Sequence, residues 1–173
     1  MSIKDSIKNA IDTNDLETLR EFSKSVTFLH IQMDGHLNPL HYAIKENKFY
    51  SVRLLVDKQH RLLQSVTESG KNILQYAVSL DNCNVHIVEY LMQKCRKEEQ
   101  IGLLRFAMER RYPFNVCNHL LRSGIDINEV FNGYTILNLL VSMRVGCRRA
   151  LNHNSMDKIK FLLNNGADTE NTG

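Results

Sequence analysis

The chain of 173 residues lacks several features that mark whole classes of protein. It has only two prolines and no sustained alternation of polar and apolar residues, which favours a mostly helical fold over one built from strands. No apolar run approaches the ~18 residues that a membrane-spanning helix needs. Its opening stretch, MSIKDSIKNA, is polar and charged, unlike a secretory signal peptide.

Cysteine is scarce and is not arranged for disulfide or metal chemistry. The four cysteines are widely spaced and form no CxxC pair: Cys83, Cys95, Cys117 and Cys147. This usage is typical of reduced thiols, and it predicts a cytoplasmic or nuclear location.

Signatures of catalysis and of cofactor binding are missing as well. The sequence contains no phosphate-binding loop, no dinucleotide-binding glycine pattern, no nucleophile elbow and no HExxH zinc pattern. Cys83 and His86 are three residues apart, but no second pair completes a four-ligand zinc site. We therefore expect no enzyme activity, no cofactor and no metal.

The charge of the chain is close to balanced, with a formal net charge of +3. That value is too small to argue for nucleic-acid binding by itself, although basic residues outnumber acidic ones from Leu104 onward. Nucleic-acid binding through the basic C-terminal half stays as a competing hypothesis, and it predicts binding that weakens steeply with salt.

The sequence repeats itself at a period near 33 residues. The leucines that begin the successive units lie 34, 30 and 33 residues apart: Leu40, Leu74, Leu104 and Leu137. Each unit reads as two short helices, the second carrying an apolar stripe at helical spacing such as Val52 and Leu55. Neither helix can bury its stripe alone, so this pattern predicts a solenoid of stacked helix pairs.

These units resemble ankyrin repeats. NPLHYAI at 38–44 is similar to the family's T-P-L-H-x-A-A signature, and 70–78 and 133–141 are degenerate copies of it. SGIDIN at 123–128 and NGAD at 165–168 resemble the G-A-D-V-N sequence that closes a repeat. The resemblance implies an all-α solenoid of helix-turn-helix units with short, partly degenerate β-hairpin fingers, working by binding another protein.

The repeats predict one domain spanning residues 1–173. Residues 1–33 are expected to be an N-terminal capping repeat with an apolar face of Ile3, Ile7, Ala10 and Ile11. Full repeats follow at 34–66, 67–97, 98–130 and 131–173, the last with an insertion at about 142–156. The junction KCRKEEQIG at 94–102 lacks a turn signature, so its hairpin is expected to be missing or replaced. No polar cap is visible on the last repeat, which predicts self-association, a partner or further chain covering it.

The residues of NPLHYAI have a structural interpretation that competes with a His/Tyr active site. Asn38 can cap a helix, and Pro39 suits its first turn. The family resemblance implies that His41 hydrogen-bonds the turn backbone and bridges neighbouring repeats. We favour this interpretation over any catalytic one.

The resemblance implies a concave binding groove lined by the fingers and by exposed residues of the first helices. The candidates at these positions are Leu37, Lys45, Glu46, Lys71, Leu80, Arg110, Phe131, Tyr134 and Met143. Large apolar groups on an exposed groove favour a protein contact, but a register shift of one residue would make them core residues instead. Three arginines of the insertion could meet an acidic partner or lie in a solvated loop: Arg144, Arg148 and Arg149.

The sequence therefore predicts a non-catalytic interaction module that acts as an adaptor, a regulatory subunit or an inhibitor. Short ankyrin proteins similar to the inhibitor of NF-κB suggest one sharper alternative, a constitutive inhibitor of a Rel-type transcription factor. No motif in the chain singles that branch out.

Overall fold

The computed structural model describes residues 2–109, 114–146 and 153–170. The chain divides into two compact units, residues 1–99 and residues 100–173. Each unit is built from pairs of short antiparallel helices, and the described residues contain no β-sheet, only two isolated β-bridges. The all-α, ankyrin-type fold class predicted from the sequence is confirmed.

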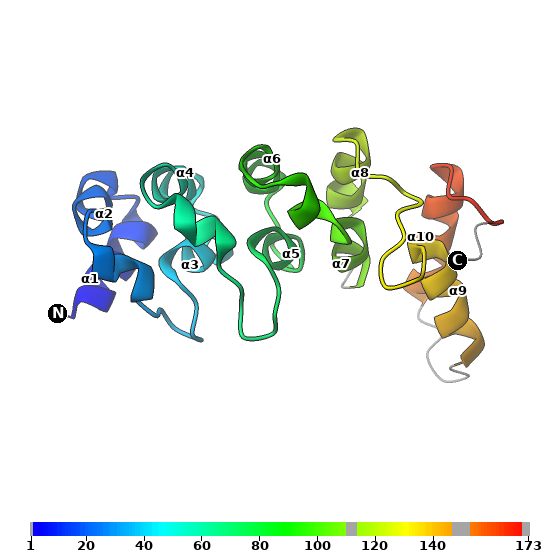
Figure 1. The fold of residues 1–173 in the computed structure, drawn as a ribbon, viewed down its shortest axis with the longest axis horizontal. Coiled ribbons are helices and arrows are strands. Elements are labelled where there is room, and N and C mark those ends of the chain that lie inside the picture. The colour runs from blue at the N-terminus through cyan, green and yellow to red at the C-terminus, as the bar shows by residue number, and fades with distance from the viewer. Residues whose placement is uncertain (1, 110–113, 147–152, 171–173) are drawn as a thin grey trace. The chain divides into compact units, whose positions relative to one another are not determined.

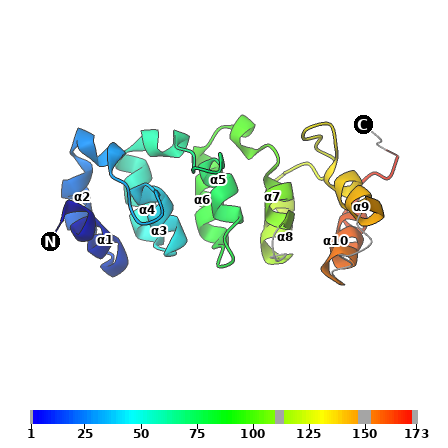
Figure 2. The same ribbon diagram turned by 90° about the horizontal axis from the view of Figure 1, so that it is seen from below.

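The first unit contains three helix pairs and three 3₁₀ turns. The pairs are α1 (Ile3–Thr13) with α2 (Leu16–Ser23), α3 (Pro39–Lys45) with α4 (Phe49–Lys58), and α5 (Ile73–Val78) with α6 (Val85–Lys94). The 3₁₀ turns are η1 (Val26–His30), η2 (His60–Gln64) and η3 (Lys97–Gln100), the last reaching into the next unit. Contacts join α1 to α3 and α3 to α5, and likewise α2 to α4 and α4 to α6, so the pairs form two helical layers (Figures 1 and 2).

The second unit contains two helix pairs. They are α7 (Leu103–Glu109) with α8 (Phe114–Arg122), and α9 (Ile136–Gly146) with α10 (His153–Asn164). The predicted apolar stripe of the second helices is buried in both units. Its buried members include Val52, Leu55, Val88, Leu91, Val116 and Leu120.

The N-terminal helix pair differs from the expectation at one residue. Ile7, Ala10 and Ile11 are buried as predicted, but the side chain of Ile3 is 64% exposed. Ile3 is the first residue of α1, and it lies one turn beyond the contacts that cover Ile7. Its place on the buried face was therefore wrong, because a 3.6-residue pattern does not say where the neighbouring layer ends.

Side chains cap the first helices at equivalent positions. Asn38 accepts a hydrogen bond from the backbone N–H of His41 at 2.8 Å, with Pro39 in the first turn of α3. Asn72 accepts one from the N–H of Gln75 at 2.9 Å, and Thr135 accepts one from the N–H of Asn138 at 3.2 Å. These caps satisfy backbone donors that a helix start leaves unpaired, so the predicted roles of Asn38 and Pro39 are confirmed.

The loops before the first helices follow the turn chemistry of the sequence. In the second unit Asn132 and Gly133 both have positive φ (53° and 83°), and Phe131 and Tyr134 form the bridge on either side of them. This is the preferred geometry of a two-residue Asn-Gly hairpin. Before α7 there is no such hairpin: η3 leads through Gly102 directly into the helix, so the predicted replacement at this junction is confirmed.

The environment of His41 corrects a prediction. The ring is buried, and neither of its nitrogens has a hydrogen-bond partner, so it does not bond the turn backbone. Instead it packs edge-on against Tyr76 of α5, with ring centroids 4.9 Å apart. It bridges neighbouring repeats by ring packing, and the loss of water around the imidazole lowers the pKa of His41 to about 4.

The His41 environment generates a prediction for acid stability. The unfolded chain takes up this proton near pH 6.5, whereas the folded ring resists it down to about 4. The free energy of unfolding should therefore be highest above pH 6.5 and should fall by roughly 3 kcal/mol as the pH drops to 4. Urea titrations across this range should show that slope in the wild type, and much less of it in His41→Leu.

The control for this experiment is His60→Gln, because His60 is exposed. That variant should keep the wild-type slope. Equal slopes in the wild type and in His41→Leu would contradict the assignment.

Candidate protein-binding surface

The predicted binding residues of the first unit lie on two loops and at the ends of two helices. Leu37 and Lys71 each directly precede the capping asparagine of a first helix, whereas Lys45 ends α3, Glu46 follows it, and Leu80 follows α5. We call this set, with the loops 31–38 and 65–72, the finger face. The two loops extend in the same direction from the unit (Figure 1).

Exposure differs among these residues. Lys45 and Glu46 are exposed, and Leu37, Lys71 and Leu80 are half-buried. The half-buried backbones close the loops: the N–H of Met33 donates to the carbonyl of Leu37 at 2.6 Å, and Thr67 donates to Lys71 at 2.9 Å. Exposed charges on a fixed backbone are therefore the groups that the finger face offers to a partner.

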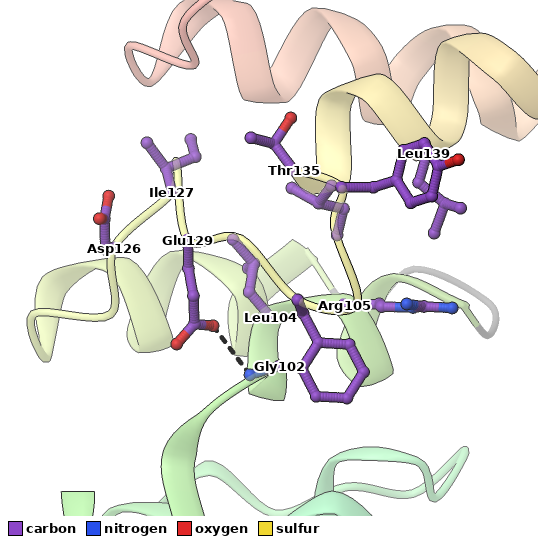
Figure 3. A pocket seen from close by; sticks show the side chains of 11 residues that line it. Gly102, Leu104, Arg105, Asp126, Ile127, Glu129, Thr135 and Leu139 are labelled. Atoms are coloured by element: carbon purple, nitrogen blue, oxygen red, sulfur yellow. Dashed lines mark hydrogen bonds between the residues drawn. The ribbon is translucent and has the colours of Figure 1, made fainter. Parts of the chain in front are cut away.

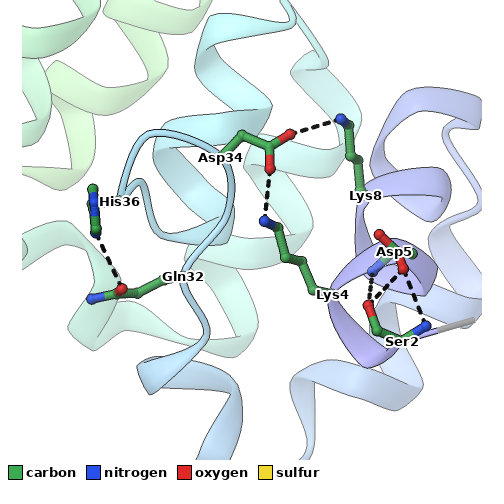
Figure 4. A network of polar contacts seen from close by, with 7 residues as sticks. All are labelled: Ser2, Lys4, Asp5, Lys8, Gln32, Asp34 and His36. Atoms are coloured by element: carbon green, nitrogen blue, oxygen red, sulfur yellow. Dashed lines mark hydrogen bonds and ion pairs between the residues drawn. The ribbon is translucent and has the colours of Figure 1, made fainter.

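The first loop is tied to α1 by an ion-pair network. Asp34 lies between two lysines of one helix face, 2.7 Å from the Nζ of Lys4 and 2.8 Å from the Nζ of Lys8 (Figure 4). Hydrogen bonds from Lys4 and Lys8, together with their positive charge, hold the pKa of Asp34 at about 2. The Asp34 carboxylate is therefore ionised throughout the physiological pH range.

The second loop approaches the first through a histidine. His36, which has a positive φ of 57°, places its Nδ1 3.6 Å from a carboxylate oxygen of Glu68 and 3.4 Å from the side-chain oxygen of Gln32. Both His36 and Glu68 are largely exposed, so their pairing is weak. It nevertheless brings side chains from two successive loops together.

Beneath the loops, a buried tyrosine joins the first and second helix pairs. The hydroxyl of Tyr42 donates to Asp12 of α1 at 3.0 Å, and Lys8 lies 5.8 Å from the centre of the Tyr42 ring. Burial, followed by the hydrogen bond to Asp12, raises the pKa of Tyr42. Lys8 thus serves both the loop and the helix interface.

In the second unit, Phe131 packs inside the unit. It is half-buried beside α7: its ring lies 6.4 Å from that of Phe106, and the guanidinium of Arg105 lies 5.4 Å from its centre. The backbone N–H of Gly102 donates to Glu129 at 2.8 Å in the same pocket (Figure 3). A role for Phe131 in partner binding stays a prediction.

The remaining predicted residues fall at the end of the chain or outside the described residues. Tyr134 is 55% exposed and directly precedes the capping residue of α9. Met143 and Arg144 lie on α9, where only their backbone is described, and Arg110, Arg148 and Arg149 lie outside the described residues.

Sequence reasoning missed the residues that fix the loops. Lys4 and Lys8 are one helical turn apart and so share a face of α1, which was a usable signal. Asp34 gave no comparable signal, because its partners lie 26 and 30 residues earlier and meet it only after the repeats stack.

The described residues offer little for other chemistry. No group of three or more His, Cys, Asp or Glu among them could hold a metal ion. Burial raises the pKa of Cys83 and of Cys95 to about 12, so both thiols stay protonated and unreactive. None of the helices in the described ranges is long and apolar enough to cross a membrane.

Comparison with known families identifies this architecture. A family model for ankyrin repeats, three copies, matches residues 7–102, more than half of the chain. The chain belongs to the ankyrin-repeat family. Ankyrin repeats indicate a protein–protein interaction module, and the fold is generally a non-enzymatic scaffold.

Solved structures agree on the fold. The ankyrin repeat protein EF0377 is 21% identical, with a TM-score of 0.64 over 97% of this chain and 84% of that one. The ankyrin repeat domain of Bcl-3, described as a member of the IκB protein family, is 17% identical, with a TM-score of 0.66 over 94% of this chain and 72% of that one. A search of curated protein sequences finds no significant match.

The ion-pair network generates a prediction for the titration of Asp34. In the wild-type ankyrin protein, NMR of the side-chain carboxyl should give a pKa of about 2 for Asp34. Replacing both lysines, Lys4→Met with Lys8→Met, should move it towards the ordinary value of 3.8, because both donors are lost. Lys24→Met removes a lysine paired elsewhere, with Glu21, and should change nothing. An unchanged Asp34 in the double variant would show that the loop is not held by these lysines.

The packing of Phe131 generates a prediction for Gly102. This glycine has a φ of +74°, and a Cβ added there would lie 3.1 Å from the Phe131 ring. Gly102→Ala should therefore cost at least about 1 kcal/mol for the backbone, plus the displacement of the ring. Gly124→Ala is the control in the same unit, since its φ is +89° and nothing lies within 4 Å of the added Cβ. Urea denaturation should show the larger loss for Gly102→Ala, and adding Phe131→Ala should remove the excess.

Proposed function

We propose that the chain binds a partner protein through the finger face of its first unit. The carrying observation is the way the two loops are fixed. Asp34 is held by two lysines of α1, and His36 meets Glu68 of the next loop. Because the loops are already ordered, little conformational entropy is lost on binding.

The charges of the finger face support contact with a polar, mixed-charge surface. Lys45 and Glu46 are exposed side by side at the end of α3, and Lys71 is half-buried on the second loop. Exposed pairs of opposite sign contribute more to specificity and to the rate of association than to affinity. The affinity would come from half-buried apolar groups such as Leu37 and Leu80.

The proposed role is that of an adaptor, a regulatory subunit or an inhibitor acting by occupancy, in the cytoplasm or the nucleus. The protonated thiols of Cys83 and Cys95 support a reducing compartment. Inhibition of a Rel-type transcription factor is an alternative within this class. The likeness to the Bcl-3 domain, at 17% identity, supports the fold and does not favour that alternative.

Nucleic-acid binding is the alternative from another class. Its support in the sequence is the basic C-terminal half, but three of those arginines lie outside the described residues: Arg110, Arg148 and Arg149. Retention of the full chain on heparin at near-physiological salt would favour it.

Matched lysine variants test the finger face. Lys45 and Lys58 are each the last residue of a helix, α3 and α4, and both are exposed. Charge reversal therefore perturbs the two helix ends in the same way. Tagged full chain should capture its partner from source cells, with the bound protein identified by mass spectrometry. Lys45→Glu should weaken binding of that partner by about tenfold or more, whereas Lys58→Glu should leave it unchanged.

Lys71→Glu provides a second probe on the other loop of the finger face. Equal binding by the wild type and by both finger-face variants would contradict the proposal. So would an equal loss of binding in Lys58→Glu, because that residue lies on the layer of second helices.

A further inference from the structure

The last helix pair carries an apolar groove of about 520 Å³. It is lined by Tyr134, Leu137 and Val141 on and before α9, by Ile159 and Leu163 on α10, and by Thr169 after it. The remaining lining residues are an asparagine and a serine of α9. We call this surface the end groove.

The end groove has the chemistry of a repeat-stacking face. Val141 lies four residues after Leu137, as Ile44 follows Leu40 and Met108 follows Leu104. Ile44 and Met108 are 2% and 1% exposed, but Val141 is 44% exposed. The repeat register therefore places an exposed valine where earlier repeats bury an apolar side chain.

The second helices show the same difference. Ile159 and Leu163 align with Val52 and Val56 of α4, where α6 packs on the unit. Val56 is 1% exposed, whereas Leu163 is 45% exposed. The end groove thus continues, in residue type and in register, the interface that joins the helix pairs of the first unit.

The residues around the end groove favour one occupant. All the groups that line it are uncharged, so two copies brought face to face would oppose no like charges. A head-to-tail chain is disfavoured, because the exposed side chains of α1 and α2 are polar or charged except for Ile3. Self-complementary pairing about a two-fold axis is the commonest form of oligomer, and it closes after two copies.

We propose that the end groove binds the end groove of a second copy, giving a two-fold dimer. This inference goes beyond the proposed function, since the finger face belongs to the other unit and stays open in the dimer. Two helices of this length present a face of roughly 16 by 20 Å. That area is at the low end for a specific interface, so the dimer is reversible and forms at micromolar or higher concentration.

Sedimentation velocity over a hundredfold range of concentration tests the proposal. The wild-type full chain should show a monomer–dimer equilibrium. Val141→Glu or Leu163→Glu puts two carboxylates into the apolar interface, one from each copy, and should weaken the dimer by about tenfold or more. Val26→Glu is the matched control: Val26 is 77% exposed in the first unit, and its substitution should leave the equilibrium unchanged.

A measurement without substitutions covers the case in which a variant fails to fold by circular dichroism. Methyl NMR signals of Val141 and Leu163 should shift with concentration in the wild type, while those of Val26 stay constant. A wild type that is monomeric throughout would overturn the proposal, leaving the groove open or to a different chain. Growth beyond the dimer, or a dimer insensitive to both groove variants in their folded state, would overturn it too.

Discussion

First helices of six or seven residues are too short to persist alone in water, because a helix must fix several residues before it gains its first hydrogen bonds. α3, α5 and α7 all fall in this range. They exist because neighbouring pairs cover them, burying Leu40, Leu74 and Leu104. Stacking between repeats is therefore the interaction on which the rest of each unit depends. The caps at Asn38 and Asn72 then decide where these helices begin.

The features that could be predicted from the sequence are those that depend on a few neighbouring residues. The cap at Asn38, the proline at the first turn and the missing hairpin at 94–102 follow from local backbone chemistry. The partner of His41 did not follow, because Tyr76 reaches it only across a repeat interface. The anchoring of Asp34 was missed for the same reason, and Ile3 was misplaced because periodicity does not show where a neighbouring layer stops.

The candidate binding surface is a by-product of the same stacking. Fixing α1 against α3 brings Lys4 and Lys8 beneath the first loop, where they hold Asp34. Fixing α3 against α5 places His36 beside Glu68. The loops are therefore ordered by interactions that also stabilise the repeats. A surface made in this way can change its exposed residues, such as Lys45, without weakening the core beneath it.

The junction at Gly102 shows how a repeat can lose its signature and keep its register. In the first unit, each capping asparagine donates to a group 27 residues later: Asn38 to Ser65, and Asn72 to the carbonyl of Glu99. Gly102 has no side chain, yet its N–H donates to Glu129, again 27 residues later. The link survives with the side chain supplied by the other partner. The ankyrin-family match ends at residue 102, where the capping asparagine gives way to this glycine, although the helix pairs continue beyond it.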